Sequence, residues 1–140
     1  MAFQVDSIQH RRHVRVISKN QDLDLAVLQV DASINGELGV GTADKLSQMD
    51  HIAIFGYPNY RLGDTGVVVP GLVVGFRPVS GIRRILTNAP IVAGASGAPV
   101  LDATGCVIGI AATGKDRMED VQDTEHHSII PVDALRFLTG

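Results

Sequence analysis

The sequence predicts an all-β fold, an antiparallel β-barrel or sandwich that ends in one α-helix. Three observations predict it. Short runs of β-branched and other apolar residues recur along the chain, 15 glycines and 6 prolines among 140 residues separate these runs, and one C-terminal segment alone has the spacing of a helix. A chain of this length supplies one domain.

The composition narrows the classes of function. Hydrophobic residues make up 45% of the chain and charged residues 19%, which is typical of a protein with a real core. With 12 basic against 15 acidic residues, and basic clusters confined to residues 10–13 and 83–84, no nucleic-acid partner is predicted. One cysteine, Cys106, excludes an intrachain disulfide, and its apolar neighbours favour a core thiol. No stretch approaches the roughly 18 apolar residues of a membrane-spanning helix, and no signal-peptide pattern is present, so no membrane partner is expected and no compartment is indicated.

The first half of the chain contains four strand-like regions. Residues 13–18 alternate polar and apolar side chains, and residues 25–30 form a second run after a polar break, so the two are expected to pair as a hairpin. Residues 49–56 form a third strand that ends at a turn. The β-branched run of residues 66–76 is interrupted by Pro70-Gly71, which indicates either one bent strand with a bulge or two strands.

Shorter strands and the helix follow in the second half. The strands are expected at residues 82–87, 98–101, 106–112 and 128–130, with a polar loop over residues 114–125. The α-helix is predicted at residues 131–138, because a proline opens this segment and Val132, Leu135 and Leu138 lie three residues apart.

The segment Gly94-Ala95-Ser96-Gly97 lies between two apolar strands and can carry chemistry. Glycine permits tight turning, and successive N–H groups in such a turn can point into one anion-binding concavity. A serine beside that concavity is able to attack a carbonyl group while the N–H groups hold the developing oxyanion. The same residues also suit a purely structural turn, so both interpretations stay open at this point.

The run Gly94-Ala95-Ser96-Gly97-Ala98-Pro99 resembles the nucleophile loop of trypsin-like serine proteases, with Ala98 in place of the family's second glycine. Further segments resemble the bacterial HtrA-like branch of that family, in the same order along residues 20–138. These segments are the aspartate strand at 22–28, the core strands at 52–58 and 71–76, the strand after the nucleophile at 105–110, and the last strand at 128–132. The resemblance implies a trypsin-like antiparallel β-barrel with a complete C-terminal barrel and a partial N-terminal one.

The resemblance also implies roles for individual residues. It places the nucleophile at Ser96, the oxyanion-hole donors at the N–H groups of Gly94 and Ser96, and the triad acid at Asp24, with Asp22 as the competing acid. Asp24 is then expected to approach Ser96 across a gap that admits one imidazole. Without the resemblance, both aspartates suit solvated turn positions before a strand.

No histidine in this sequence matches the family's base, which lies several tens of residues before the aspartate in a Thr-Ala-Ala-His-like motif. His10 and His13, beside two arginines, are expected to form a solvated basic turn, and His51 a strand edge. His126 and His127 only precede the last strand. We therefore expect one peptidase domain over residues 1–140 that is truncated at its N-terminus, with residues 1–50 as the remnant of the first barrel and 51–140 as the second barrel and helix. The alternatives are a catalytically inactive peptide-binding module and an unrelated all-β interaction domain.

The resemblance also indicates the substrate. Segments 88–93 and 109–114 correspond to the walls of the pocket for the residue before the scissile bond, and Pro90, six residues before Ser96, supplies no carboxylate. An apolar pocket is expected, and cleavage of a peptide or unfolded protein after small aliphatic residues is predicted. No cofactor and no metal are predicted. The residues expected to line the pocket are Pro90, Ile91, Val92, Ile110, Ala111 and Ala112.

Overall fold

The computed structural model describes residues 3–7, 10–30, 36–57, 61–91, 94–112 and 128–138, with side chains from His13 onward. The chain folds into two compact units, which are taken here one at a time. The first unit comprises Met1–Glu37 with Ala134–Gly140, and the second comprises Leu38–Asp133.

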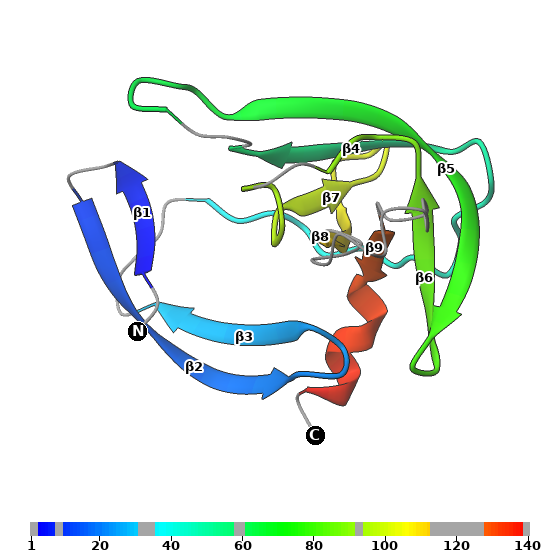
Figure 1. Ribbon diagram of the computed structural model, residues 1–140, viewed down its shortest axis with the longest axis horizontal. Helices are drawn as coiled ribbons and strands as arrows, with labels where there is room; N and C mark the ends of the chain where they lie inside the picture. Colours follow the sequence, from blue (N-terminus) through cyan, green and yellow to red (C-terminus); the bar gives the residue numbers. More distant parts are fainter. Residues whose placement is uncertain are drawn as a thin grey trace, which may run out of the picture. The chain divides into compact units, whose positions relative to one another are not determined.

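The second unit is a closed antiparallel barrel with the strand order β4-β5-β6-β9-β8-β7 (Figure 1). This barrel confirms the predicted all-β antiparallel fold. Strand β5 is continuous through Pro70 and Gly71, so the two-strand alternative is wrong. The register shift in β5 lies between Val73 and Gly75 in its pairing with β6, and not at Pro70-Gly71. The six strands are β4 (His51–Gly56), β5 (Val67–Val79), β6 (Ile82–Thr87), β7 (Pro99–Leu101), β8 (Val107–Ala112) and β9 (Ser128–Pro131).

Alternating side chains of the barrel strands form its core. In β4, Ile52 and Ile54 are 3% and 2% exposed, whereas His51 and Phe55 on either side of them are exposed and Ala53 between them is half-buried. This is the period of two expected of a half-buried strand. Five of the six residues of β8 and all four residues of β9, its neighbour in the barrel, are buried. The largest fully buried side chains are Ile85, Ile108, Ile129, Ile130, Val73 and Val100.

The first unit contains a three-stranded antiparallel sheet in the order β1-β2-β3, with β1 at Phe3–Ser7, β2 at His10–Asn20 and β3 at Leu25–Val30. The hairpin of β2 and β3 is the one predicted, and its register shifts between Val16 and Ser18. The predicted basic turn at residues 10–13 is wrong, because these residues belong to β2 and pair with β1. The sequence analysis did not predict β1. Its pairing with β2 supplies the hydrogen-bond partners that keep residues 10–13 extended.

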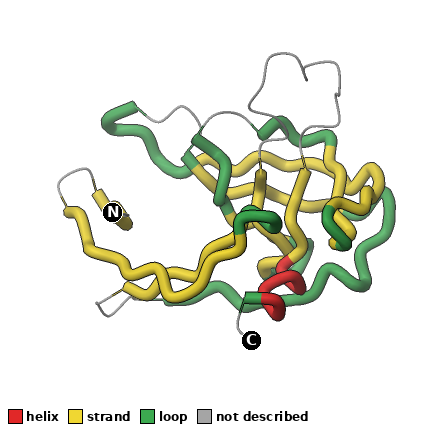
Figure 2. The backbone as a smooth tube through the Cα atoms, turned by 60° about the horizontal axis from the view of Figure 1, so that its bottom comes forward, coloured by secondary structure: helices red, strands yellow, loops and turns green. Residues whose placement is uncertain are grey.

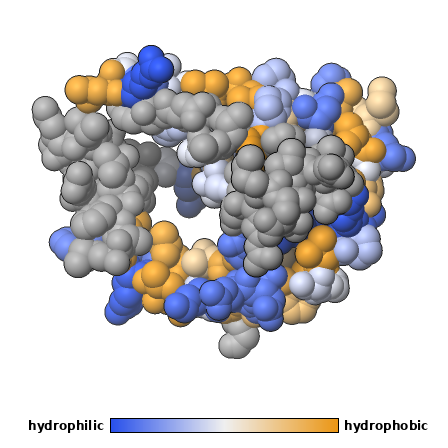
Figure 3. All heavy atoms as spheres, viewed as in Figure 1, coloured by the Kyte–Doolittle hydropathy of each residue, from blue (hydrophilic) through white to orange (hydrophobic). Residues whose placement is uncertain are grey.

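Several apolar side chains of the three-stranded sheet remain exposed. Val16, Ile17 and Leu28 are 48%, 53% and 47% exposed, and apolar side chains appear among polar ones over β3 in Figure 3. Val16 and Leu28 are directly opposite each other in the β2–β3 ladder, so they form one apolar pair. Among the residues of the first unit whose side chains the structure describes, the buried apolar ones are Leu23, Leu25, Ala134 and Leu138.

The C-terminal helix η2 (Val132–Phe137) is a 3₁₀-helix, which corrects the predicted α-helix; it follows the last strand and is drawn in red in Figure 2. Pro131 belongs to β9 and not to the helix. The spacing of three between Val132, Leu135 and Leu138 matches the three residues per turn of a 3₁₀-helix, and the Leu138 N–H donates to the Leu135 carbonyl at 2.9 Å. Within the described residues, no helix has the length and apolar character needed to span a membrane.

Candidate active site

Ser96 lies at the corner of a tight turn between the buried residues Ala95 and Ala98. The Ala98 N–H donates to the Ala95 carbonyl at 3.1 Å, and Gly97 has a φ of 90°. A positive φ at the third residue of a four-residue turn is the signature of type II, which requires glycine there. Ala95 and Ala98 are 5% and 9% exposed, whereas Ser96 between them is exposed. The turn therefore holds the serine hydroxyl at the surface on a backbone anchored in the core.

The serine turn is also hydrogen-bonded to β8. The Gly97 N–H donates to the Ala111 carbonyl at 2.8 Å, and the Ala111 N–H donates to the Ala98 carbonyl at 2.9 Å. Ladder pairing continues from there, with Pro99 opposite Ile110. The N–H groups of Gly97 and Ala98 are used within the fold. The assignment of the N–H groups of Gly94 and Ser96 as oxyanion donors stays a prediction from the family resemblance. Gly94 itself has a φ of 89°, so the chain turns sharply on both sides of Ser96.

Ala98, which replaces the family's second glycine, is accommodated by a neighbouring strand. A side chain on Gly56 at the end of β4 would place its Cβ 3.1 Å from the Ala98 Cβ. That distance is tighter than ordinary van der Waals contact, so the absence of a side chain at residue 56 makes room for the Ala98 methyl group. The methyl group then packs within the barrel core.

The residues expected to form the substrate pocket lie on both sides of the serine turn. Ile91 and Ala111 belong to the barrel core at 3% and 2% exposure, and Ala112 is also buried, at 3%. Pro90 is exposed and Ile110 is half-buried. Val92 falls outside the described residues. The described part of this set is apolar, and the hydrogen bonds between the serine turn and Ala111 bring β8 alongside Ser96.

Two residues that the sequence analysis did not single out support the segment before Pro90. The buried Thr87 hydroxyl donates to the Leu72 carbonyl at 2.9 Å and accepts from the Ala89 N–H at 3.0 Å. The Asn88 side-chain oxygen accepts from the Leu72 N–H at 2.8 Å. These bonds fix the backbone that leads toward the serine turn. The only signal in the sequence was a pair of polar residues at the end of a strand, before Ala89 and Pro90.

Asp24 closes the turn between β2 and β3. Its φ is 57°, a left-handed conformation that aspartate tolerates better than most residues, and its N–H donates to the Gln21 carbonyl at 3.2 Å. The Asn20 side chain stabilises the same turn by accepting from the Leu23 N–H at 3.1 Å. Both Asp22 and Asp24 are exposed, while Leu23 between them is 8% exposed.

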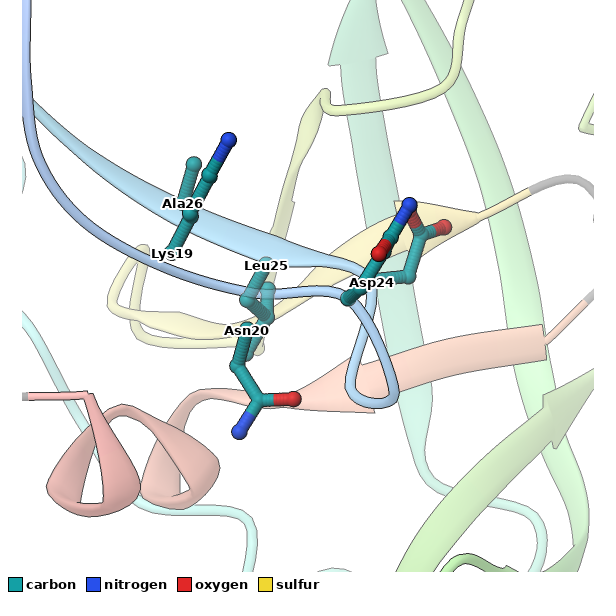
Figure 4. Close-up of a pocket in the computed structure, with 6 residues that line it drawn as sticks. Lys19, Asn20, Asp24, Leu25 and Ala26 are labelled. Carbon is teal, nitrogen blue, oxygen red and sulfur yellow. The ribbon is translucent and has the colours of Figure 1, made fainter.

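An open pocket of about 510 Å³ lies at the Asp24 turn. Figure 4 shows Lys19 beside Ala26, the Asn20 side chain directed to the opposite side of the strand, and Asp24 at the turn beyond them. The ladder pairs Lys19 with Ala26 and Asn20 with Leu25, which explains this alternation. The residues that line the pocket are Lys19, Asn20, Gln21, Asp24, Leu25 and Ala26.

The candidate acid and the candidate nucleophile belong to different units, Asp24 to the first and Ser96 to the second. Their approach across one imidazole stays a prediction.

Of the histidines, His13 is an exposed residue of β2, and His51 is the exposed first residue of β4, as predicted. His10 lies in β2, whereas His126, His127 and the polar loop at 114–125 fall outside the described residues.

The turn presents an exposed serine between two glycines on an antiparallel barrel. This is the arrangement that the resemblance to trypsin-like serine proteases led us to expect. Residues 2–110 match the trypsin-like peptidase domain family, and the chain belongs to that family. Its closed barrel and strand order have the fold of the HtrA-type proteases, as solved structures show.

Among solved structures, Deg5 is 23% identical, and the match covers 91% of this chain and 59% of Deg5 with a TM-score of 0.72. The active form of the Rv3671c protease from M. tuberculosis is 18% identical, covering 93% of this chain and 58% of that one with a TM-score of 0.72. The HtrA-type protease AlgW, solved with a decapeptide, is 23% identical, covering 89% of this chain and 38% of AlgW with a TM-score of 0.71.

A protein relative is known from Sinorhizobium fredii, the uncharacterized protein y4bJ. It is 28% identical over 112 residues, which are 79% of this chain. The chain spans 18% of the length of that relative and 59% of the length of Deg5.

Proposed function

We propose that this chain is part of a serine endopeptidase in which Ser96 is the nucleophile. Membership of the trypsin-like peptidase family supports the reaction class. The single observation that carries the proposal is the turn itself, which exposes Ser96 between Gly94 and Gly97, both at positive φ, and anchors its flanks in the barrel core.

The chemistry would follow from these groups. The Ser96 hydroxyl attacks the carbonyl carbon of a peptide bond, and the N–H groups of Gly94 and Ser96 donate to the oxyanion that forms. In trypsin-like proteases a histidine takes the serine proton and later returns it to the leaving amine, while an aspartate orients that histidine. Here Asp24 would be the orienting acid. A serine without a base is a poor nucleophile, so the histidine is an essential part of the site.

We propose that the base comes from a polypeptide longer than these 140 residues, and that the three-stranded sheet is part of its first barrel. The exposed apolar pair Val16 and Leu28 supports this, because further strands would cover it. The larger size of Deg5 and AlgW is consistent with it. The peptide in the AlgW structure supports a peptide as the substrate.

A fluorophosphonate probe tests the nucleophile, because it reacts with the activated serine of such a site. The gene's full reading frame is expressed, and the labelled peptide is identified by mass spectrometry. Label is expected on Ser96 and is expected to disappear in Ser96→Ala, while Ser47→Ala, which removes an exposed serine of the same unit, keeps it. Label that persists in Ser96→Ala would refute the assignment. Absence of label in a folded parent protein would favour the inactive peptide-binding alternative.

A further inference from the structure

Two side chains at the end of β6 bind both backbone polar groups of one residue in β5. The Leu72 N–H donates to the side-chain oxygen of Asn88 at 2.8 Å, and the Leu72 carbonyl accepts from the Thr87 hydroxyl at 2.9 Å. The same hydroxyl accepts from the Ala89 N–H at 3.0 Å. Thr87 is 7% exposed, so its hydroxyl is largely withdrawn from water and depends on these partners. We call these hydrogen bonds the Leu72 clamp.

The Leu72 clamp lies where the β5–β6 ladder ends. The last backbone pair of that ladder is Val73 with Thr87, and β6 ends at Thr87. Side chains rather than backbone groups therefore bind the neighbouring residue of β5. This releases the backbone after Thr87 from the ladder while its first residues stay fixed to β5.

Close packing holds the next residues in one orientation. A Cβ on Gly71 would lie 2.6 Å from the Ala89 Cβ and 3.1 Å from the Asn88 side-chain oxygen, so the absence of a side chain at residue 71 lets this segment lie directly on β5. Ala89 and Ile91 are 1% and 3% exposed and belong to the barrel core, whereas Pro90 between them is exposed. The segment therefore alternates inward and outward, and Pro90 is its outward residue.

Strand β5 is itself held firmly, since it lies between β4 and β6 in the barrel (Figure 1). The segment before β4 adds further hydrogen bonds to it. The Val73 N–H donates to the Asp50 carbonyl at 2.9 Å, and the Gln48 side-chain nitrogen donates to the Val74 carbonyl at 3.0 Å. Leu72 is thus part of a fixed stretch of strand, and the clamp attaches residues 88–91 to that stretch.

We propose that Thr87 and Asn88 are positioning residues for substrate specificity, because the Leu72 clamp sets which side of residues 89–91 faces the substrate. This inference rests on the proposed function and on the assignment of Pro90 and Ile91 to the pocket. With the clamp intact, this segment offers a fixed apolar wall that fits a small aliphatic side chain. Without the clamp, the segment can turn about its own axis, and the wall no longer matches that side chain.

Loss of the clamp is expected to leave the nucleophile reactive. The serine turn has hydrogen bonds of its own to β8, through the Gly97 N–H and the Ala98 carbonyl, and none of them involves the clamp. Specificity and reactivity are therefore expected to separate in clamp variants. This separation distinguishes a positioning role from a general contribution to stability.

Two covalent probes measure that separation in the product of the full reading frame. A fluorophosphonate without a peptide side chain reports only how reactive Ser96 is. A diphenyl phosphonate of valine reacts with the same serine, whose oxygen displaces phenoxide from phosphorus, but it also needs the pocket to hold the valine side chain. In Asn88→Ala, labelling by the valine probe is expected to slow by about tenfold, while labelling by the fluorophosphonate stays within about twofold of the parent.

Conservative variants and a matched control make the test specific. Asn88→Asp keeps an oxygen that accepts from the Leu72 N–H, so labelling by the valine probe is expected to recover. Gln48→Ala also removes a side-chain hydrogen bond to the β5 backbone, but away from the clamp, and is expected to leave both rates unchanged. Equal slowing with both probes in Asn88→Ala, or an unchanged rate with the valine probe, would overturn the proposal. Should Asn88→Ala fail to fold, Thr87→Val, which removes only the buried hydroxyl, decides by the same criterion.

Hydrogen exchange at the Leu72 amide tests the clamp without any catalysis. Fragmentation mass spectrometry resolves this amide, and its exchange is expected to be about tenfold faster in Asn88→Ala than in the parent, but not in Asn88→Asp or Gln48→Ala. Unchanged exchange in Asn88→Ala would also overturn the proposal. If the fluorophosphonate does not label Ser96 of the parent, the proposed function fails and the specificity role fails with it, while the exchange result still stands.

Discussion

The N–H of Gly97 donates to the carbonyl oxygen of Ala111 at 2.8 Å, which fastens the residue after Ser96 to strand β8. The serine is therefore held on a backbone whose position depends on β8. Strand β8 is also the strand expected to form one wall of the substrate pocket. A change in β8 is thus expected to affect the serine and the pocket together.

Substrate preference follows from the apolar character of the described pocket residues. Pro90, Ile91, Ala111 and Ala112 offer no carboxylate to a basic side chain, whereas burial of a substrate Val or Leu side chain would contribute roughly 1.5–3 kcal/mol. Profiling of the full-length protein with a peptide library is expected to show cleavage after small aliphatic residues, with Ser96→Ala as the blank. A dominant preference for Lys or Arg would contradict the pocket assignment.

Charge removal at Asp24 tests its role as the triad acid. Asn accepts the left-handed conformation of Asp24 as readily as Asp does, so Asp24→Asn removes the charge without straining the turn. In the active full-length protein, kcat is expected to fall by about 10⁴-fold, as for loss of the acid in a Ser-His-Asp triad of this family. Asp22→Asn, two residues away and equally exposed, is the control. A larger loss in Asp22→Asn would reverse the assignment of the acid.

Gly109 is expected to be essential for closing the barrel. A Cβ at this position would lie 2.4 Å from Ile129 Cγ2 and 2.8 Å from the Ile130 carbonyl oxygen of the neighbouring β9. Gly109→Ala is therefore expected to lower the free energy of unfolding by about 1–3 kcal/mol in urea titrations. Gly75→Ala is the control, because its Cβ would meet its nearest neighbour, Leu86 Cδ1, at an ordinary 3.7 Å. Equal effects of the two substitutions would argue against a role for close β8–β9 packing.

Stability at acidic pH is expected to depend on Asp102. The Thr104 hydroxyl is the largest cause that lowers the pKa of Asp102; burial opposes it, and backbone N–H groups of the same turn lower the pKa further. A carboxyl whose pKa is lower in the folded state than in the unfolded state stabilises the fold above its unfolded pKa. That contribution is lost as the pH falls through the folded value.

Unfolding free energies measured from about pH 6 to pH 2 test this dependence, a range that brackets ordinary carboxyl pKa values. Thr104→Val removes the largest cause of the shift, so its stability is expected to decline less steeply than that of the parent below about pH 4. Thr42→Val removes a hydroxyl that donates to a different carboxylate, Asp133, and serves as the comparison. Identical pH profiles for the parent and Thr104→Val would show that Asp102 does not contribute.

Local patterns in the sequence were sufficient for most of the strands and for the serine loop. The hairpin of β2 and β3 and the type II turn at Ser96 both depend on residues close in the chain, such as Gly97, whose positive φ the turn requires. The motif at residues 94–99, together with five further segments in the same order along the chain, indicated the family, which the comparisons confirm.

Tertiary structure decided the features that depend on partners distant in the sequence. Residues 10–13 form a strand because β1 pairs with them, and the last helix is a 3₁₀-helix of six residues between Pro131 of β9 and Leu138, whose carbonyl binds Ser18. The hydrogen bond between Asp133 and Thr42 spans 91 residues, and no local periodicity encodes it. Hydrophobic periodicity reports which face of an element is buried, whereas the choice of hydrogen-bond partner depends on which segments the folded chain brings together.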